Sequence, residues 1–407
     1  MKLSSKFWII VFAEGIMVCG YSMAFPFLAL YLTQNRGFNM SIVGVYFSIV
    51  MIISSFSSTI GGSVSDYVGR KKIMFFSLLI RGIFVALITI SIKFNFNPLW
   101  ILFFNFVASV GGLGFHSVAL AYISDIVCEK NRIKAYSILR VSTNAGWAAG
   151  PAIGGFLSNI SYSLAFGVSS LVFLFAAFLV LIKAEDIKKN FQSSPKKFYF
   201  FYDFNRDFKK ILFYSFLMTA VMSQLVIPLS IYSKKYLNFS EKQIGFLFTL
   251  NGLIVVVIQY FIGSKIKDSK TVNAIALSCL FYALGYLIFG YSPNYTVAML
   301  SIAVVTLGEV VFSPSLSSLV SSVSPESKRG AYMGIHSMIS DLGRSFGVFA
   351  GTFLIDKVSG VFREVSWYFV FGLSIFSFFG FLSLKKNSKE EISELTIKKE
   401  MDMERPN

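Results

Sequence analysis

The sequence predicts an all-α membrane protein with twelve transmembrane helices arranged as two pseudo-symmetric six-helix halves. Of its 407 residues 55% are hydrophobic and only 14% are charged, whereas soluble domains carry about a quarter charged residues. Apolar runs of the roughly 20 residues that a span requires recur from Phe7 to Leu384. A series of glycines in the first half of the chain also recurs in the second. We therefore expect no soluble domain between the spans.

The spans follow one another with short connections, except at the centre of the chain. We place them at residues 7–33, 41–65, 72–92, 98–127, 136–158, 162–183, 211–234, 241–265, 271–291, 295–322, 331–355 and 366–384. The apolar part of the first is far longer than the roughly 7 to 15 residues of a signal peptide, so we expect it to be retained. The predicted units are an amino-terminal half (1–183), a central loop (184–210), a carboxy-terminal half (211–384) and a tail (385–407).

The positive charges predict the orientation of these spans. Lys and Arg are enriched in short cytoplasmic loops. The termini and the even-numbered connections hold 27 of the 37 Lys and Arg residues, the other connections hold seven, and three lie inside spans. This distribution predicts that both termini are cytoplasmic. The net charge of +16 is explained in the same way, because most of the Lys and Arg residues lie in the short loops and the tail that orient the spans. We therefore expect no nucleic-acid partner.

The repeat is carried mainly by glycines in the fifth and eleventh spans. Gly146, Gly150 and Gly154 recur 197 positions later as Gly343, Gly347 and Gly351. Glycine is frequent in membrane helices, so a single match means little, but several matches in the same order indicate duplicated halves. Two similar halves around a shared site are typical of a secondary transporter.

The connection between spans 2 and 3 contains a specific motif. Its sequence GGSVSDYVGRKK fits the pattern G-x-x-x-D-x-x-G-R-K with Gly62, Asp66, Gly69, Arg70 and Lys71. This connection resembles the signature loop of the major facilitator superfamily, in which it acts as a latch between the halves. The resemblance implies that Asp66 meets the start of a helix in the other half, and that Arg70 pairs with Asp125 at the cytoplasmic end of span 4. A carboxylate is stabilised at a helix N-terminus. The second-half counterpart keeps Asp268 but lacks the G-R-K ending.

A second motif lies in span 5, within NAGWAAGPAIGG. The residues are Gly146, Gly150, Pro151, Gly154 and Gly155. They are similar to the G-x-x-x-G-P-x-x-G-G motif of the drug:proton antiporter branch of the superfamily. Glycines at this spacing allow close helix packing, and proline kinks a helix. The motif can therefore serve coupling or only packing.

Carboxylates inside spans are the candidates for proton coupling or substrate binding, because ionisable groups are costly there. Glu309 near the middle of span 10 is the first candidate, and Glu14 and Asp341 are the second candidates. Glu309 belongs to a G-E followed by S-P, a pattern similar to one that occurs in drug exporters and also in proton-coupled oligopeptide transporters. Span 1 lacks the E-x-x-E-R-F pattern of that branch, so the motifs favour export of drug-like solutes over peptide uptake.

The remaining charges within spans have predicted partners in two of three cases. Asp341 and Arg344 are three residues apart, hence on one helix face, and we expect an internal pair. We expect Arg140 to join the cytoplasmic charges around Asp66, Arg70 and Asp125. Arg81 has no predicted partner. For His116 and His336 a buried, hydrogen-bonded imidazole is the expectation, with titration as the alternative.

The sequence therefore predicts a secondary active transporter that works by alternating access, with proton-coupled efflux of drug-like amphipathic compounds as the first hypothesis. Proton-coupled uptake of a small nutrient such as a peptide or sugar is the alternative. No G-x-x-x-x-G-K-[ST] loop, G-x-S-x-G elbow or histidine-rich metal cluster occurs, so we expect neither a primary pump nor an enzyme. We expect no cofactor and no metal, a proton gradient as energy source, a small-molecule substrate, and a monomer in the lipid bilayer of the cell membrane.

Overall fold

The computed structural model of the chain describes residues 4–112, 114–185, 204, 206–263, 271–324, 329–358 and 362–403. Every regular element in these ranges is a helix, as predicted. The amino-terminal half contains α1 Ser5–Leu30 with a π-helical turn Tyr31–Asn35, α2 Met40–Val68, α3 Arg70–Lys93, α4 Pro98–Gly112, α5 Gly114–Ile126, α6 Glu129–Ile160 and α7 Tyr162–Lys183. The carboxy-terminal half contains α8 Arg206–Met222 with a 3₁₀ turn Ser223–Leu225, α9 Ile227–Tyr236, α10 Glu241–Gly263, α11 Thr271–Gly290, α12 Tyr295–Ser322, α13 Arg329–Phe353 with a π-helical turn Leu354–Val358, and α14 Val365–Met403.

Most of these helices can cross a membrane. In the described ranges, nine helical segments are long and apolar enough, and α8 with α9, which meet at a bend of 44°, make a tenth. The helices α6 and α13 match the fifth and eleventh predicted spans but are less apolar than the other spans, because they carry the glycine series and several small polar residues. They are therefore not counted among the helices that are apolar enough to cross a membrane. The membrane-protein class is confirmed, and the number of twelve spans stays a prediction.

The two halves repeat the same close helix packing. A Cβ atom added to Gly150 of α6 would lie 2.0 Å from Ser22 Oγ of α1, and one added to Gly347 of α13 would lie 2.2 Å from Ser223 Oγ. These glycines are 197 positions apart and the serines 201. Each pair of helices approaches so closely that only glycine fits at the contact. The pseudo-symmetry predicted from the glycine series is thus present in the packing.

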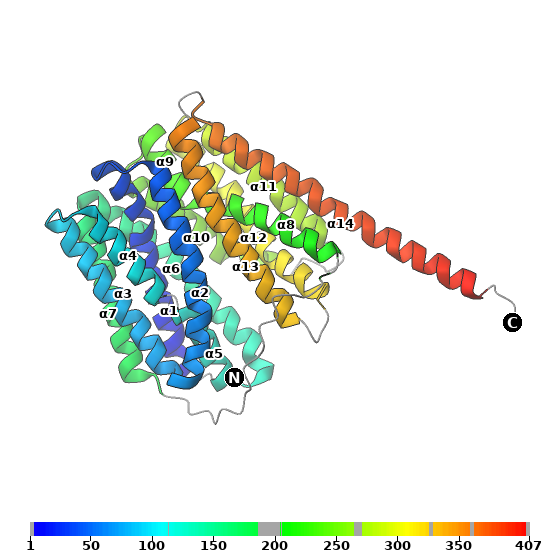
Figure 1. Cartoon of the computed structure of the whole chain (residues 1–407), viewed down its shortest axis with the longest axis horizontal. Helices are drawn as coiled ribbons and strands as arrows, with labels where there is room; N and C mark the ends of the chain where they lie inside the picture. Colours follow the sequence, from blue (N-terminus) through cyan, green and yellow to red (C-terminus); the bar gives the residue numbers. More distant parts are fainter. Residues whose placement is uncertain are drawn as a thin grey trace.

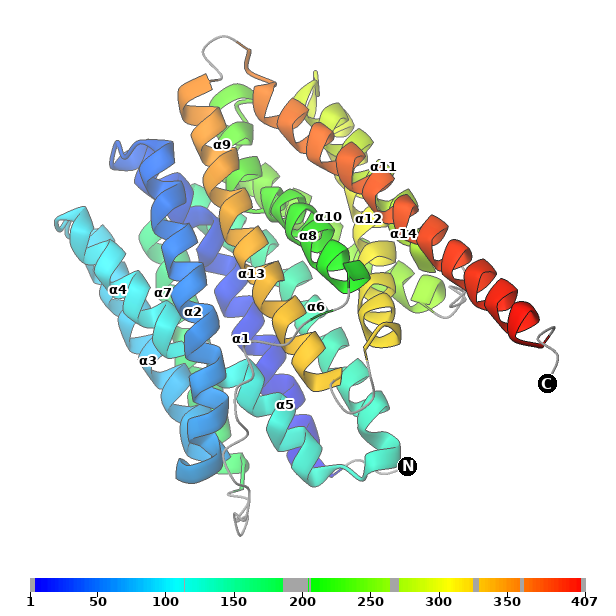
Figure 2. The ribbon, with the colours of Figure 1, turned by 45° about the vertical axis from the view of Figure 1, so that its right-hand side comes forward.

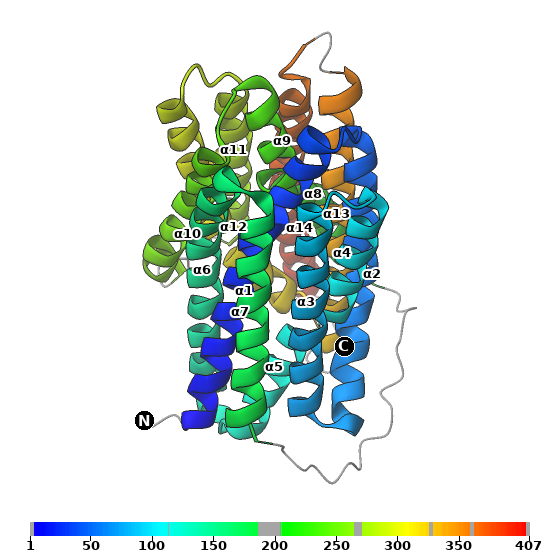
Figure 3. The ribbon, with the colours of Figure 1, turned by 90° about the vertical axis from the view of Figure 1, so that its left-hand side faces the viewer.

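The start of α1 and the end of α7 lie at the same end of the bundle (Figure 3). There the Nζ atom of Lys6 lies 2.5 Å from a carboxylate oxygen of Glu185. We call this the inner end and the opposite end the outer end. Of the predicted central loop, residues 184–210, the structure describes 184, 185, 204 and 206–210, and α8 already begins at Arg206 within it.

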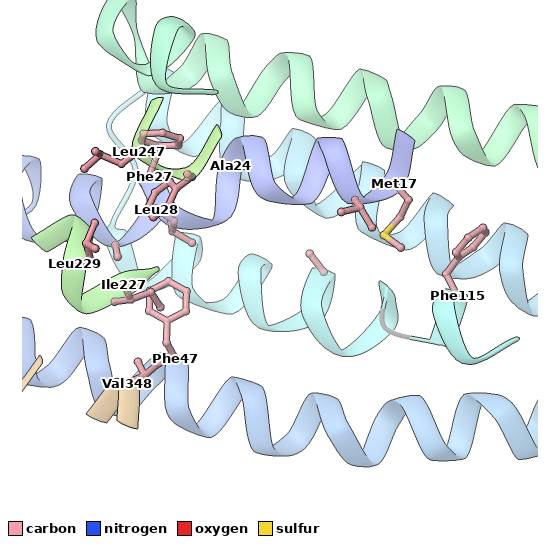
Figure 4. Packing of buried hydrophobic residues seen from close by; sticks show 14 of the residues in the cluster. Met17, Ala24, Phe27, Leu28, Phe47, Phe115, Ile227, Leu229, Leu247 and Val348 are labelled. Carbon is pink, nitrogen blue, oxygen red and sulfur yellow. The ribbon is translucent and has the colours of Figure 1, made fainter. Parts of the chain in front are cut away.

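The halves meet where α6 packs against α10 and α2 packs against α13. In Figures 1 and 2, α2 and α13 lie side by side at the outer end and diverge toward the inner end. Buried apolar side chains from both halves share one cluster, in which Phe27 lies close to Leu247, and Phe47 lies close to Ile227 and Val348 (Figure 4). The outer end is therefore closed by apolar packing between the halves.

Candidate functional site

The charged connection between α2 and α3 is a sharp turn at Gly69. This glycine has φ of 106°, in the left-handed region that favours glycine, and α2 ends before it while α3 begins after it. The close approach to α5 is made by Gly61, whose added Cβ would lie 3.0 Å from the Cα atom of Gly114. At Gly62 the nearest atom would be 3.9 Å away. The turn thus brings the first residue of α3, Arg70, against α5.

Arg70 holds the inner ends of α2, α3 and α5 together. Its Nε atom donates to Asp125 Oδ2 at 2.5 Å, its Nη2 atom lies 2.9 Å from Asp66 Oδ1, and its Nη1 atom donates to Ser65 Oγ at 3.1 Å. The side chain of Asp125 is 4% exposed, whereas that of Asp66 is 41% exposed. The structure therefore joins Arg70 and Asp125, as the motif implied, in a buried ion pair.

The rest of the expected latch is not seen to join the halves. The described ion pair of Asp66 is with Arg70, inside its own half, and Lys71 is half-buried at the start of α3. Side chains at the start of α13, residues 329–331, and the counterpart acid Asp268 lie outside those described. That Asp66 meets a helix start in the other half stays a prediction.

A carboxylate does cap a helix of the other half, at the outer end. Asp356, in the turn after α13, accepts hydrogen bonds from the backbone nitrogen of Ser41, at 3.4 Å, and from its hydroxyl. Ser41 is the second residue of α2, where free backbone N–H groups favour an anion. Burial alone would raise the pKa of Asp356, but these bonds and the charge of Lys357 hold that pKa below its ordinary value. Asp356 therefore latches the outer end in its charged form.

Removing this latch is expected to loosen the outer end. The pKa of Asp356 is lower in the closed state, so the stabilisation is complete at neutral pH and is lost as pH falls through that lowered value. At pH 7 the test is Asp356→Ala, which should cost about 0.5–2 kcal/mol of closure, the range of helix N-caps. In a cysteine-free background, Ser48→Cys reports closure by its labelling rate from the outer side. Asp356→Asn, which keeps an acceptor oxygen, should label at an intermediate rate, and equal rates for all variants would contradict the latch.

Polar contacts continue from this cap along α2 and α13. Ser48 Oγ donates to the backbone oxygen of Ser345 at 2.7 Å, and Ser55 Oγ donates to Asp341 Oδ2 at 2.6 Å. Asp341 also forms the expected pair with Arg344. From Ser41 to Ser55 the contacts span about 21 Å at 1.5 Å per residue. Asp341 thus pairs within α13 and also bonds to the other half.

Glu309 lies half-buried in the middle of α12. Its Oε2 atom accepts a hydrogen bond of 2.8 Å from Asn251 Nδ2 of α10, and Asn251 also donates to Thr306 Oγ1 at 3.0 Å. The charge of Arg140, on α6 of the other half, interacts with that of Glu309. Arg140 therefore interacts with an acid across the interface, and its place among the cytoplasmic charges stays a prediction.

Glu14 forms a pair that the sequence did not predict. Its Oε1 atom lies 2.6 Å from His116 Nδ1 of α5. The side chain of Glu14 is 1% exposed, so it does not reach interfacial water, whereas that of His116 is 49% exposed. The expectation of a buried His116 was therefore wrong. The other histidine, His336, is half-buried, and its Nε2 atom has no hydrogen-bond partner among the described residues.

Arg81 is buried next to this pair rather than extended to the membrane surface. It is 4% exposed, donates from Nε to the backbone oxygen of Ala108 at 3.3 Å, and its guanidinium lies over the rings of Tyr21 and Phe173 at 5.2 and 5.5 Å. An added Cβ at Gly112 would lie 2.0 Å from Arg81 Nε. The glycine therefore makes room for the guanidinium, which explains an arginine whose partner the sequence did not reveal.

The span-5 motif packs on two sides. Gly146, Gly150 and Gly154 face the backbone of α1. On the other side, the added Cβ of Gly155 would lie 3.1 Å from Gly245 Cα, while that of Gly245 would lie 2.2 Å from the backbone oxygen of Pro151. The motif therefore packs α6 within its own half and also against α10 of the other half.

Comparison with known proteins decides the family. A model of the Major Facilitator Superfamily matches residues 10–348 and 211–395. The chain belongs to the major facilitator superfamily. Its members are transporters and not enzymes.

Relatives of this transporter differ in what their names report. The "Quinolone resistance protein NorA" of Staphylococcus aureus is 22% identical over 386 residues, covering 92% of this chain and 95% of that one. Among solved structures, a mutant of the nucleoside transporter NupG has a TM-score of 0.80 at 14% identity, over 93% and 100% of the two chains. A proton-dependent oligopeptide transporter has a TM-score of 0.77 at 15% identity, over 95% and 99%. These structures support the superfamily fold.

Two interactions of this transporter were not predicted from the sequence, the pair of Glu14 with His116 and the cap of Asp356 on α2. Glu14 lies nine residues after the start of α1 and His116 ten before the end of α5, so both are about 15 Å from the inner end. Their equal depth can be read from the sequence, but the proximity of α1 and α5 cannot. Asp356 directly follows the eleventh span and lies at the same membrane depth as the start of the second span. That the two meet can be recognised only when the neighbouring helices are known.

Proposed function

We propose that this transporter exports drug-like amphipathic compounds in exchange for protons, by alternating access. The observation that carries the proposal is Glu309, a half-buried acid in α12 whose charge interacts with Arg140 of the opposite half. A proton on Glu309 removes a negative charge from the interface and leaves Arg140 without that compensation. Similarity to NorA along nearly the full length of both chains supports a drug-like substrate.

The described contacts suggest how the cycle proceeds. The outer end is closed by the Asp356 cap and by the apolar cluster, whereas α2 and α13 diverge toward the inner end (Figure 2). We infer an inward-facing conformation, in which Glu309 exchanges its proton for substrate from the inner side. A change of 1.4 kcal/mol between the two openings shifts their ratio tenfold, so a single charge at the interface suffices to bias the cycle.

We place this transporter in the cell membrane as a monomer, with both termini cytoplasmic. The excess of Lys and Arg at the termini and in the even-numbered connections supports this orientation. The start of α1 and the end of α7 share the inner end, as that topology requires. The inner end is then the cytoplasmic end.

Proton-coupled uptake of a small nutrient is the second candidate. It rests on Gly308 and Glu309 followed by Ser313 and Pro314, a pattern shared with oligopeptide transporters. The two candidates differ in the direction of movement relative to the proton gradient. Export by antiport concentrates substrate on the acidic side of a membrane, whereas symport concentrates it on the alkaline side.

Reconstitution in liposomes tests the proposal. With a pH gradient imposed, ethidium and norfloxacin are expected to accumulate on the acidic side, and a dipeptide is not. Glu309→Gln should abolish accumulation while leaving downhill exchange measurable. Glu185→Gln, the same chemical change at the exposed Lys6 pair, is the matched control and should behave as wild type. Uphill accumulation by Glu309→Gln as strong as that of wild type would show that Glu309 is not the coupling acid.

A further inference from the structure

We propose that Glu14 and His116 form a second proton-binding site, in the amino-terminal half, which exchanges its proton through His116. The inference rests on the proton coupling proposed above and extends it from one site to two. It explains why an acid and an imidazole meet inside the half that does not contain Glu309.

The geometry gives the two groups different roles. The Oε1 atom of Glu14 and the Nδ1 atom of His116 are 2.6 Å apart, close enough to share a proton. The carboxylate is 1% exposed and the imidazole side chain 49% exposed. If the pair served only to provide hydrogen-bond partners for buried polar groups, both side chains would be buried. Here one member is accessible and the other is hidden directly behind it, which is the arrangement of a buried acid with an entrance.

The second oxygen of Glu14 is also free to take a proton. Its Oε2 atom is buried and has no hydrogen-bond partner among the described residues. Buried polar atoms of proteins are nearly always hydrogen-bonded, so this oxygen needs an explanation. A carboxylic acid carries its proton on one oxygen and accepts a hydrogen bond on the other, which fits the two environments of Glu14.

Because of the charges around the pair, binding one proton changes the net charge of the cluster formed by Glu14, His116 and Arg81. Arg81 of α3 is buried, and its charge interacts with that of Glu14. With neutral His116 the charges of Glu14 and Arg81 cancel, so one added proton leaves the cluster with a charge of +1. Loading and unloading this site therefore changes the charge of the amino-terminal half by one unit, as a coupling site must.

No other described charge replaces Arg81 in facing Glu14. Ser142 of α6 packs at Gly15, the residue after Glu14, and Phe173 of α7 lies beneath the guanidinium of Arg81. Among the described side chains, the remaining charged ones on α1 and on the helices packed against it are Lys6 with Glu185, Asp125 with Arg70, Lys234 with Glu241, Lys235, Arg140 with Glu309, and the exposed Lys183 at the end of α7.

The site is not a copy of the one at Glu309. The repeated packing that relates Ser22 to Ser223 places Ser215 of α8 at the position of Glu14. Glu309 lies instead on α12, in a helix that corresponds to the fourth span. The two acids occupy different places in their halves and have different arginines. Each can therefore bind its own proton, and the exchange should involve two protons per cycle.

Histidine NMR tests the site without any substrate, because the chain has only two histidines. In protein labelled with ¹⁵N- and ¹³C-histidine in detergent micelles, His336→Gln assigns the two imidazoles. We expect the His116 signal to titrate between about pH 5 and 9, and Glu14→Gln to move its midpoint by about 1 pH unit or more. Glu309→Gln should leave that midpoint unchanged. If Glu14→Gln does not yield folded protein, Glu14→Asp replaces it and should also move the midpoint.

Each result bears on the proposal directly. A wild-type His116 signal that does not titrate in this range overturns it, as does a midpoint that is the same with and without the Glu14 carboxylate. Transport is measured separately, as protons moved per ethidium in proteoliposomes, with two expected for wild type and one for Glu14→Gln or His116→Gln. If wild type moves no ethidium, the exporter hypothesis fails for this dye, while the histidine titration still decides the proton site.

Discussion

Arg70→Ala is expected to lower the free energy of unfolding by about 3–5 kcal/mol, the cost of removing one partner from a buried ion pair. The reason is Asp125, whose side chain is 4% exposed and loses the guanidinium 2.5 Å away. Reversible unfolding by SDS in mixed micelles, followed by tryptophan fluorescence, measures the change. Asp66→Asn touches the half-exposed partner of the same guanidinium, and should cost less than about 1 kcal/mol.

A double variant separates the ion pair from general damage. If Arg70 and Asp125 act on each other, Arg70→Ala with Asp125→Asn should lose less stability than the two single changes added together, by about 1–3 kcal/mol. Strict additivity would show that the buried charges are stabilised by other groups. Equal losses for Arg70→Ala and Asp66→Asn would show that burial does not distinguish the two carboxylates.

The helices themselves were predicted from hydropathy. The span at 295–322 coincides with α12, and the structure adds its N-cap, Asn294, whose side chain accepts from the Val297 nitrogen at 3.0 Å. The helix α14 instead continues to Met403, beyond the predicted end at 384. Hydropathy marks where the apolar segment ends, while a helix continues as long as its residues favour helix.

The site was predicted where chemistry is local and missed where it depends on neighbours. The partners Arg70 and Asp125, 55 residues apart, were predicted because the resemblance of the loop to the superfamily signature implies an acid at the cytoplasmic end of span 4 as the partner of Arg70. The Glu14–His116 pair required knowing that α1 and α5 face each other, and no periodicity of one helix contains that information. The same holds for Asn251, which binds Glu309 from α10, and for the cap of Asp356 on α2.

The described contacts between the halves suggest that opening the outer end costs several small interactions rather than one large one. The Asp356 cap, the serine bonds of α2 and the packing of α6 on α10 are each modest; the first two join α2 to α13 and its following turn, and the third joins α6 to α10. Because such contacts form only in the closed state, changing one should alter the balance of conformations without unfolding either half. Glycines that pack inside one half should behave differently.

Valine at Gly150 and valine at Gly245 are therefore expected to damage the transporter in different ways. A Cβ on Gly150 lies 2.0 Å from Ser22 Oγ and 2.5 Å from the backbone oxygen of Cys19, both within the same half. That clash persists in every conformation, so Gly150→Val should lose most of the folded protein, with at least the 1–3 kcal/mol typical of overpacking. Monodisperse yield on gel filtration measures this loss, and Gly334→Val, which has no neighbouring atom within 4 Å, is the matched control.

Gly245→Val should leave each half folded and open the outer end. Its Cβ would lie 2.2 Å from the backbone oxygen of Pro151, which belongs to the opposite half, so the clash disappears when α6 and α10 separate. We expect near-normal yield together with at least tenfold faster labelling of Ser48→Cys from the outer side, equivalent to a shift of about 1.4 kcal/mol in the conformational balance. If Gly245→Val instead loses as much folded protein as Gly150→Val, the contact between α6 and α10 is required for folding, and the halves do not separate at this surface.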